Sequence, residues 1–278
     1  MKTIGIVGLG VMGASFAQRA KALGYRVLGI DLDPDTIEYA VMRGMVDKGS
    51  TDASILLDQC DIVLLALYPR QMQKWLLRYQ HDMNPGTLIL EISGVKSNVT
   101  QPAQALLRDD LELLSIHPMC GRESRGIEFA DPAIFDQANF IIIPQPSNST
   151  NAIVFTSAFA KELGCKNVSV LSVEEHDRMI GFLSQLTHVI AVALMNTHEN
   201  SHLVEYTGDS FRDLTRIAKI NEDMWTELFL LNKDILLDEI DQFAASVQQF
   251  RDLLVREDVD AMKSAMVQST ARRKKFDR

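Results

Sequence analysis

The stretch Gly8-Leu9-Gly10-Val11-Met12-Gly13 follows an apolar run, Ile4 to Val7, and precedes a helical pattern from Ala14 to Leu23. Between a strand and a helix, the first glycine permits a tight turn and the second lets the backbone approach a pyrophosphate. The third lets the helix pack closely on the strand. The helix N-terminus then offers N–H groups and the positive end of its dipole to phosphates. The stretch therefore predicts a dinucleotide site formed by Gly8, Gly10, Met12 and Gly13.

Asp31 ends the next apolar strand, Val27 to Ile30, at the separation of about 20 residues expected for the acidic partner of a ribose 2′-hydroxyl. A carboxylate at this place would repel the 2′-phosphate of NADP. No basic residue follows closely, since the next four residues are Leu32, Asp33, Pro34 and Asp35. We therefore predict NAD as the cofactor, with Asp31 as its ribose ligand.

The composition of the 278 residues is that of an ordinary globular protein, with 46% hydrophobic and 23% charged residues. The net charge of −9 argues against nucleic-acid binding, which requires clustered basic charge. The one basic cluster, Arg272 to Lys275, fits the solvated last turn of a helix, where cations complement the dipole.

The three cysteines, Cys60, Cys120 and Cys165, have the spacing of neither a metal site nor a disulfide framework, so we expect no metal. Free thiols are typical of a reducing compartment. The N-terminus enters the first strand without a separate signal segment. No apolar run approaches the roughly 20 residues that span a bilayer. These features predict a cytoplasmic protein with no membrane and no nucleic-acid partner.

Short apolar runs alternate with amphipathic stretches as far as Val170. The run Asp61 to Leu67 is nearly all apolar, as is expected of a strand buried on both faces. Further strands are predicted at 87–90, 111–116, 140–143 and 168–170, and helices at 36–42, 71–79, 99–107 and 149–163. This alternation predicts an α/β fold with a parallel, doubly wound Rossmann sheet, whose ligand site lies beyond the carboxyl ends of the strands.

After Leu171 the pattern becomes purely helical. Ser172 and Glu175 fit a capping box, and a helix with an apolar stripe follows to about His198. Further helices are predicted at 223–237, 239–255 and 259–271. We therefore divide the chain into a dinucleotide-binding domain, residues 1–171, and an all-helical substrate and dimerisation domain, residues 172–278. These helices are too apolar for a small solitary bundle, so we expect them to form a homodimer.

Four further stretches indicate the chemistry. They are Glu91 to Lys96 and His117 to Glu123, each just past a predicted strand, Ser184 to His188 in the long helix, and Phe211 to Ala218 followed by Asn221 to Trp225. His117 lies at the end of a strand in a cofactor-binding sheet, and this position favours a functional role over a loop cap.

The other candidates have structural alternatives. His188 lies in an apolar helix and is interpreted equally well as a hydrogen-bonded core histidine or as a site residue. The apolar neighbours of Arg216 favour a buried guanidinium, which needs a partner such as an acidic ligand or Asp213. His176 and Asp177, near the start of the long helix, are interpreted as surface or capping residues.

Together these stretches resemble the prephenate/arogenate dehydrogenase family of tyrosine biosynthesis, in order and over nearly the whole chain. The shared features are the glycine fingerprint, a G-V-K variant of an S-V-K motif, H-P-M-x-G-x-E, H-D, S-x-L-x-H, and F-R-D-x-T-R-I-A with a following M-W. The last two motifs together are not shared by dehydrogenases in general. The resemblance implies NAD-dependent oxidative decarboxylation of prephenate to 4-hydroxyphenylpyruvate, or of arogenate to tyrosine.

The resemblance also implies roles for individual residues. His117 matches the base that takes up the proton of the ring hydroxyl, for which an ordinary histidine pKa of ~6.5 is well suited at neutral pH. Arg216 matches the arginine that binds the side-chain carboxylate of the substrate, and His188 matches a histidine of the substrate pocket. The family's serine before V-K is Gly94 here, so we assign the catalytic hydroxyl to Ser93, one residue earlier.

Two alternatives stay open at this point. β-Hydroxyacid dehydrogenases also join such a sheet to a helical domain, but they use a catalytic lysine on the long helix, and no lysine occurs between Lys166 and Lys219. The other alternative is a non-catalytic NAD-binding protein that dimerises through its helices. The absence of serine at Gly94 favours it, whereas the presence of His117 and Arg216 argues against it.

The residues after the second strand predict that the purified protein binds NAD more tightly than NADP, because the Asp31 carboxylate would lie against a 2′-phosphate. Titration of the protein with each cofactor measures the two affinities. Tighter binding of NADP would refute the assignment of Asp31.

Overall fold

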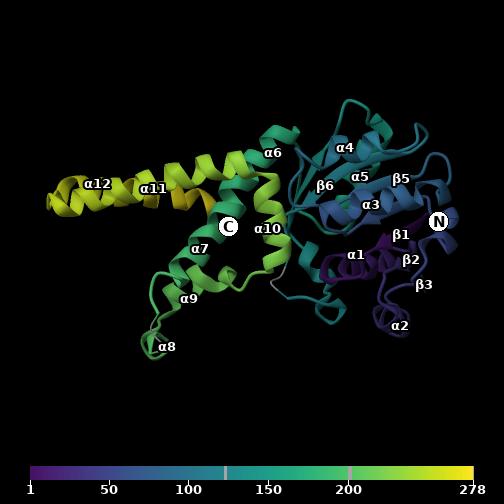
Figure 1. Cartoon of the computed structure of the whole chain (residues 1–278), viewed down its shortest axis with the longest axis horizontal. Coiled ribbons are helices and arrows are strands. Elements are labelled where there is room, and N and C mark those ends of the chain that lie inside the picture. Colours follow the sequence, from purple (N-terminus) through teal and green to yellow (C-terminus); the bar gives the residue numbers. More distant parts are fainter. Residues whose placement is uncertain (122–123, 200–201, 278) are drawn as a thin grey trace. The chain divides into compact units, whose positions relative to one another are not determined.

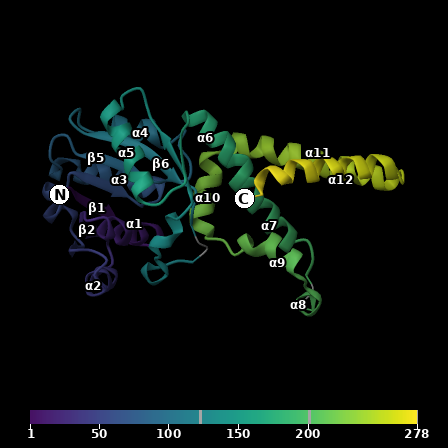
Figure 2. The same cartoon turned by 180° about the vertical axis from the view of Figure 1, so that it is seen from behind.

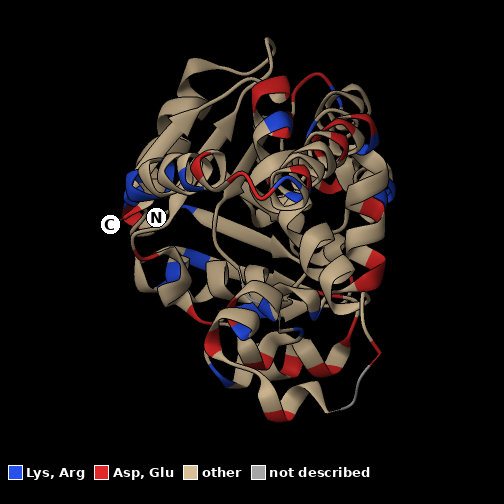
Figure 3. Cartoon of the chain, turned by 90° about the vertical axis from the view of Figure 1, so that its left-hand side faces the viewer, with Lys and Arg blue, Asp and Glu red and all other residues tan. Residues whose placement is uncertain are grey.

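The computed structural model describes residues 1–121, 124–199 and 202–277 (Figures 1 and 2). Its contacts divide the chain into two compact units, Met1–Asn232 and Lys233–Arg278. The first unit contains the sheet, the helices that cover it and the first helices after Leu171, and the second contains two long helices. Figure 3 shows acidic and basic residues interspersed along the described chain, whose full sequence has a net charge of −9.

An eight-stranded sheet forms the centre of the first unit. Its strands are β1 (Thr3–Val7), β2 (Arg26–Ile30), β3 (Lys48–Ser50), β4 (Ile62–Leu65), β5 (Leu88–Glu91), β6 (Glu112–Pro118), β7 (Asn139–Ile143) and β8 (Asn167–Val170). They lie in the order β3-β2-β1-β4-β5-β6-β7-β8. The first six strands run parallel, so the carboxyl ends of β1, β4, β5 and β6 share one edge of the sheet.

The sheet departs from the predicted parallel arrangement at one place. β7 pairs antiparallel with β6, with Ser115 opposite Ile143, and β8 then runs parallel to β7. A parallel neighbour needs a crossover connection, usually a helix. In the described part of the connection from β6 to β7 the helical segments are two short 3-10 turns, Ile127–Phe129 and Pro132–Phe135. The chain therefore returns beside β6 in the opposite direction.

Helices cover both faces of the sheet, as a doubly wound fold requires. They are α1 (Val11–Ala22), α2 (Pro34–Met42), α3 (Pro69–Tyr79), α4 (Thr100–Ala105) and α5 (Thr150–Glu162). Phe16 of α1 and Phe159 of α5 belong to the core on one face, and Met72 and Leu76 of α3 belong to the core on the other. Because both faces are covered, every residue of β4 is buried, and the strand appears in the sequence as a continuous apolar run.

The predicted long helix is present with one irregularity. Ser172 and Glu175 form the predicted capping box at its start. The helix then consists of α6 (Val173–Ile180), a π-helical segment (Gly181–Leu186) and α7 (Thr187–Met195). Single π-helical turns inside α-helices are frequent at functional sites.

The helix predicted at 223–237 is instead two helices, α10 (Glu222–Leu231) and α11 (Lys233–Val255). Asn232 separates them with φ −116° and ψ 26°. Its buried amide donates hydrogen bonds to Asp177 O (3.1 Å) and Gln185 Oε1 (2.7 Å). These two hydrogen bonds to the long helix end α10 at Asn232, although the helix propensity of the sequence indicates no break there.

Three further helices complete the described chain. Two short ones, α8 (Leu203–Tyr206) and α9 (Asp209–Thr215), precede α10 and were not predicted. In the second unit, α12 (Val259–Arg273) packs against α11. The domain boundary after Leu171 stays a prediction, because the contacts of α6 and α10 with the sheet loops group these helices with the first unit.

The run Val173–Met195 is long and apolar enough, by length and composition, to cross a membrane, contrary to the expectation that no segment reaches this length. Core helices of soluble proteins pass the same test. This helix carries His176, Asp177 and Gln185, which are buried and hydrogen-bonded within the first unit. Such groups inside a bilayer are costly, so these contacts favour packing within protein.

Replacing Ser172 with alanine is expected to lower the free energy of unfolding by about 1 kcal/mol, because the cap hydrogen bond to Glu175 N is lost. Chemical denaturation measures this change. Ser264 is a matched control, since it is an exposed serine inside α12 whose hydroxyl bonds to Asp260 O. S264A should change the same quantity by less than about 0.5 kcal/mol. Equal losses in the two variants would contradict the capping role of Ser172.

Candidate active site

The loop after β1 has the shape of a pyrophosphate cradle. Gly8 has a φ of +85°, and a Cβ there would lie 2.6 Å from Ala66 O. A Cβ on Gly13 would overlap the Gly8 carbonyl oxygen, whereas the Cβ position of Gly10 has no atom within 4 Å. The first-turn amides of α1, which lack partners within a helix, begin at this loop. The loop therefore fits a bound dinucleotide, with open space at Gly10 for the phosphates.

Asp31 lies at the end of β2, beside the same loop. Its Oδ2 accepts a hydrogen bond from Leu9 N (2.7 Å), and its Oδ1 accepts one from Asp33 N (3.0 Å). Each carboxylate oxygen can accept a second hydrogen bond, so the side chain is held in place and can still bind a ribose hydroxyl. Met12 is partly buried and packs against the core under the loop.

A buried ion pair lies at the end of β5. Lys96 Nζ donates to Glu91 Oε1 (2.6 Å) and to Ile116 O (2.9 Å), and both charged side chains are fully buried. Burial lowers the pKa of Lys96, and the Glu91 carboxylate opposes that shift. The pair holds the loop after β5 against the end of β6.

Ser93 and Gly94 form the turn of this loop. Ser93 Oγ donates to Val95 O (3.0 Å), and Ser93 N donates to Glu91 Oε2 (2.8 Å). Ser93 is only 6% exposed, so its hydroxyl serves the turn itself. A Cβ on Gly94 would lie 3.2 Å from Leu228 Cδ1, which shows that a leucine of α10 packs where a side chain of residue 94 would begin.

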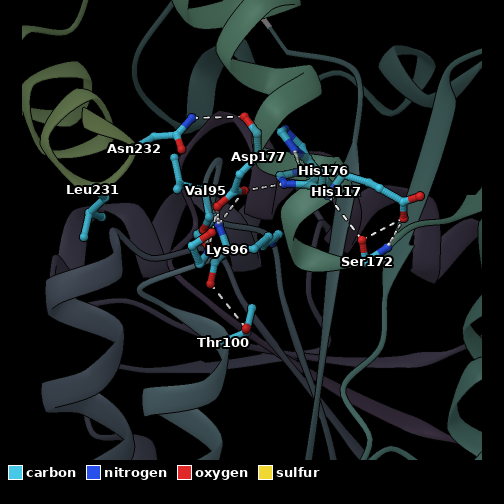
Figure 4. A network of polar contacts seen from close by, with 12 residues as sticks. Val95, Lys96, Thr100, His117, Ser172, His176, Asp177, Leu231 and Asn232 are labelled. Carbon is cyan, nitrogen blue, oxygen red and sulfur yellow. Dashed lines mark hydrogen bonds and ion pairs between the residues drawn. The ribbon is translucent and has the colours of Figure 1, made fainter. Parts of the chain in front are cut away.

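His117, at the end of β6, begins a chain of hydrogen bonds (Figure 4). His117 Nδ1 lies 2.8 Å from His176 Nε2, and His176 Nδ1 lies 2.7 Å from Asp177 Oδ1. His176 and Asp177 are fully buried, so the prediction that they are surface or capping residues is wrong. At helical spacing both lie on the face of Ile180, the first residue of the apolar stripe. That spacing is the signal that could have placed them in the interior.

The Asp177 carboxylate also connects the helix to the sheet. It accepts hydrogen bonds from the backbone N–H groups of Lys96 (3.0 Å) and Ser97 (2.7 Å) in the loop after β5. Burial raises the pKa of Asp177, but the hydrogen bonds from His176 and Ser97 outweigh burial, and the pKa lies below its ordinary value. Asp177 is therefore ionised at neutral pH.

Burial lowers the pKa of His117 well below its ordinary value, and the neighbouring His176 and Lys96 lower it further. Burial also lowers the pKa of His176, although the hydrogen bond with Asp177 opposes this shift. Both imidazoles are therefore neutral at pH 7. The ordinary pKa assumed for His117 from the sequence is wrong, and the base stays unprotonated into mildly acidic solution.

His188 and Arg216 lie on elements that pack together. His188 Nδ1 is 2.8 Å from Ser184 O in the π-helical segment. The His188 ring contacts the Trp225 ring at an interplanar angle of 30°, with centroids 3.7 Å apart. The turn Arg216–Ala218 packs against α7, the helix that carries His188. Arg216 is exposed and not buried as its apolar neighbours suggested, so its guanidinium is within reach of solvent and of a ligand.

α10 connects the helical side of the site to the sheet loops. Asn221 caps its first turn and donates to Tyr68 Oη in the loop after β4 (2.9 Å). Leu228 O accepts a hydrogen bond from Gln185 in the π-helical segment (3.0 Å). Sequence reasoning missed these contacts, because single polar residues of this kind carry no motif.

The structure thus gathers part of the predicted site directly. His117 and the loop that carries Ser93 are joined through Lys96 and Asp177, and the glycine loop lies at the same edge of the sheet. The last two residues of the predicted His117 stretch, Arg122 and Glu123, lie outside the described residues.

Two family models match the chain. The nucleotide-binding domain of prephenate dehydrogenase matches residues 15–169, and the dimerization domain of prephenate dehydrogenase matches residues 172–268. The chain belongs to the prephenate dehydrogenase family. Its Rossmann-like sheet with a following helical region is the fold of that family, as the sequence predicted.

Individual relatives agree with this family. The chain is 27% identical over 266 residues to prephenate dehydrogenase of Bacillus subtilis, covering 93% of this chain and 71% of the relative. It is 26% identical over 267 residues to cyclohexadienyl dehydrogenase of Zymomonas mobilis, covering 93% and 90%. The crystal structure of Aquifex aeolicus prephenate dehydrogenase with hydroxyphenyl propionate and NAD+ matches with a TM-score of 0.92 and 27% identity, covering 100% of this chain and 99% of that one.

Replacing Lys96 with methionine is expected to destabilise the fold by about 3–5 kcal/mol, because Glu91 would keep a buried charge without a partner. The double variant E91Q/K96M removes both charges and should be more stable than K96M. Urea denaturation compares the variants with the wild type. Arg178→Met breaks the exposed pair of Arg178 with Glu174 and serves as the control, with an unchanged midpoint. A similarly small effect of K96M would contradict the buried pair.

Proposed function

We propose that this protein uses NAD to oxidise and decarboxylate prephenate or arogenate, and so acts in tyrosine biosynthesis. The observation that carries the proposal is a neutral, half-buried histidine, His117, at the sheet edge that also holds the glycine loop of the cofactor site. The family relationship narrows the reaction to that of prephenate dehydrogenases. Names among the relatives include cyclohexadienyl and arogenate dehydrogenases, so both substrates are candidates.

The reaction removes a hydride and carbon dioxide from a cyclohexadienol. The hydroxyl proton is taken up as the hydride leaves, and a proton returns to the phenolate oxygen that forms when carbon dioxide is lost. NAD+ accepts the hydride from the hydroxyl-bearing ring carbon. The chain must take the hydroxyl proton, hold the ring in place and bind the side-chain carboxylate. The electron pair of the bond that releases carbon dioxide enters the ring, which becomes aromatic.

His117 is the base of this proposal. Its Nδ1 is engaged with His176, so Nε2 is the nitrogen that can accept the hydroxyl proton. A base in this position typically contributes ~10²–10⁴ to the rate. Ser93 acts in our proposal by fixing the loop after β5, since its hydroxyl is bonded to Val95 O.

Arg216 and His188 are proposed to bind the substrate. A guanidinium offers a planar pair of donors that suits a carboxylate, and Arg216 lies exposed on a turn packed against α7. The His188 ring is fixed by Ser184 O and Trp225, which suits it to position the ring of the substrate.

We further propose a cytoplasmic homodimer that assembles through the helical region. The family model that matches residues 172–268 is a dimerization domain. The helices expose large apolar side chains that a second copy would cover, among them Phe182, Leu183, Phe243, Val247 and Phe250.

Incubation with NAD and either prephenate or arogenate should produce NADH, which absorbance measures directly. His117→Asn is expected to lower kcat by ~10²–10⁴ while leaving NAD binding in place. Arg216→Ala should mainly raise KM for the substrate, because it removes a bidentate contact.

Two variants serve as controls for this assay. His81→Asn and Arg178→Ala change exposed residues of the same types outside the site and should behave like the wild type. Full activity of His117→Asn would refute the base assignment. NAD binding without turnover of either substrate would favour a non-catalytic protein, and oxidation of a β-hydroxyacid would favour the other dehydrogenase class.

A further inference from the structure

The chain of hydrogen bonds from His117 to Asp177 fixes the positions of its protons. An ionised carboxylate only accepts hydrogen bonds, so His176 Nδ1 carries the proton in its contact with Asp177. His176 Nε2 therefore has a free lone pair, and the 2.8 Å contact requires His117 Nδ1 to be the donor. His117 Nε2 is then unprotonated and makes no hydrogen bond with the described residues.

We propose that His176 receives a proton during the reaction, so that the positive charge formed by base catalysis rests beside Asp177 and not on His117. This inference rests on the proposed function. As the O–H bond of the substrate breaks, an N–H bond forms at His117 Nε2. The Nδ1–H bond of His117 breaks, and an N–H bond forms at His176 Nε2. NAD+ takes the hydride, so the step needs no other oxidant.

The charges around the two rings favour this direction. Lys96, in the loop after β5, disfavours a cation on either ring. Among the described residues, only His176 of the two is hydrogen-bonded to a carboxylate, that of Asp177 at 2.7 Å. Glu91, held by Lys96, also favours a cation on His176. A proton on His176 is therefore better compensated than a proton on His117.

The total charge of the buried cluster points the same way. Before proton transfer, Glu91, Lys96 and Asp177 carry one excess negative charge, and both histidines are neutral. Uptake of one proton makes the cluster neutral, and buried charge is least costly when compensated.

His176→Gln separates proton transfer from simple positioning. The glutamine carbonyl can still accept a hydrogen bond from His117 Nδ1, but glutamine has no basic nitrogen. We expect kcat to fall on the order of 10²-fold, as for the loss of a proton acceptor, with little change in KM. His81→Gln, an exposed histidine, is the matched control and should be unchanged.

Two kinetic readouts respond to a relay and not to positioning alone. The kcat of the wild type in mixtures of H2O and D2O should depend non-linearly on the deuterium fraction, because two protons move together, and that of H176Q should depend linearly. The acidic limb of kcat/KM should move to lower pH in H176Q, because the proton must then stay on His117, where burial and Lys96 oppose it. A linear dependence for the wild type, or an unmoved acidic limb in H176Q, would overturn the proposal.

Nitrogen-15 NMR of the histidine-labelled wild type tests the starting arrangement without any turnover. At pH 7 both His117 and His176 should carry their proton on Nδ1 and have an unprotonated Nε2, with H176Q used to assign the signals. A protonated Nε2 on either ring would overturn the proposal. Absence of turnover with both substrates would instead contradict the proposed function, and the two failures are thus distinguishable.

Discussion

The carboxylate of Asp177 is the group on which the site depends. It binds two backbone N–H groups of the loop after β5 and the Nδ1 of His176. The same contact therefore docks the long helix on the sheet and sets the tautomer of the histidine pair. A neutral residue in place of Asp177 could keep some of these hydrogen bonds, but it would not compensate the positive charge of a protonated His176. Docking of the helix and the chemistry of His117 are linked through this one side chain.

The sheet supplies the other half of the geometry. β1, β4, β5 and β6 are parallel neighbours, so their carboxyl ends share one edge. The glycine loop and Tyr68 follow β1 and β4 there, and the Glu91–Lys96 pair and His117 lie at the ends of β5 and β6. α10 then spans this edge, with Asn221 bonded to Tyr68 and Leu228 packed on Gly94. The helical region that carries His188 is thereby fixed against the loops that surround the cofactor site. The departure of this chain from the S-V-K motif lies at that contact, since Leu228 packs where a side chain at residue 94 would start.

Features that depend on local sequence could be predicted, and features that depend on distant contacts could not. The glycine loop, the strands and the capping box of Ser172 follow from spacing and residue type, because each is decided within a few residues. The break at Asn232 was missed, since it is produced by hydrogen bonds to Asp177 and Gln185, far away in the chain. The antiparallel β7 was missed because strand direction depends on what the connecting segment forms.

The site divides in the same way. His117 could be found from its place after a strand, and the family resemblance added His188 and Arg216. His176 and Asp177 were assigned to the surface because charged and polar residues in the first turn of a helix usually are exposed or cap it. Their helical spacing to Ile180 indicates an interior position. The partners of the buried Asp177 carboxylate, the backbone N–H groups of Lys96 and Ser97, are brought to it only by the fold. The low pKa of His117 likewise comes from burial, which residue type alone does not report.

The proposed mechanism depends on which group of the substrate faces Nε2 of His117. A crystal structure of the protein with NAD and the phenolic product tests this most directly. The account predicts the product hydroxyl within about 3.2 Å of His117 Nε2, with the side-chain carboxylate on Arg216. A product hydroxyl placed away from His117, with His117 and Arg216 on separate surfaces, would contradict it.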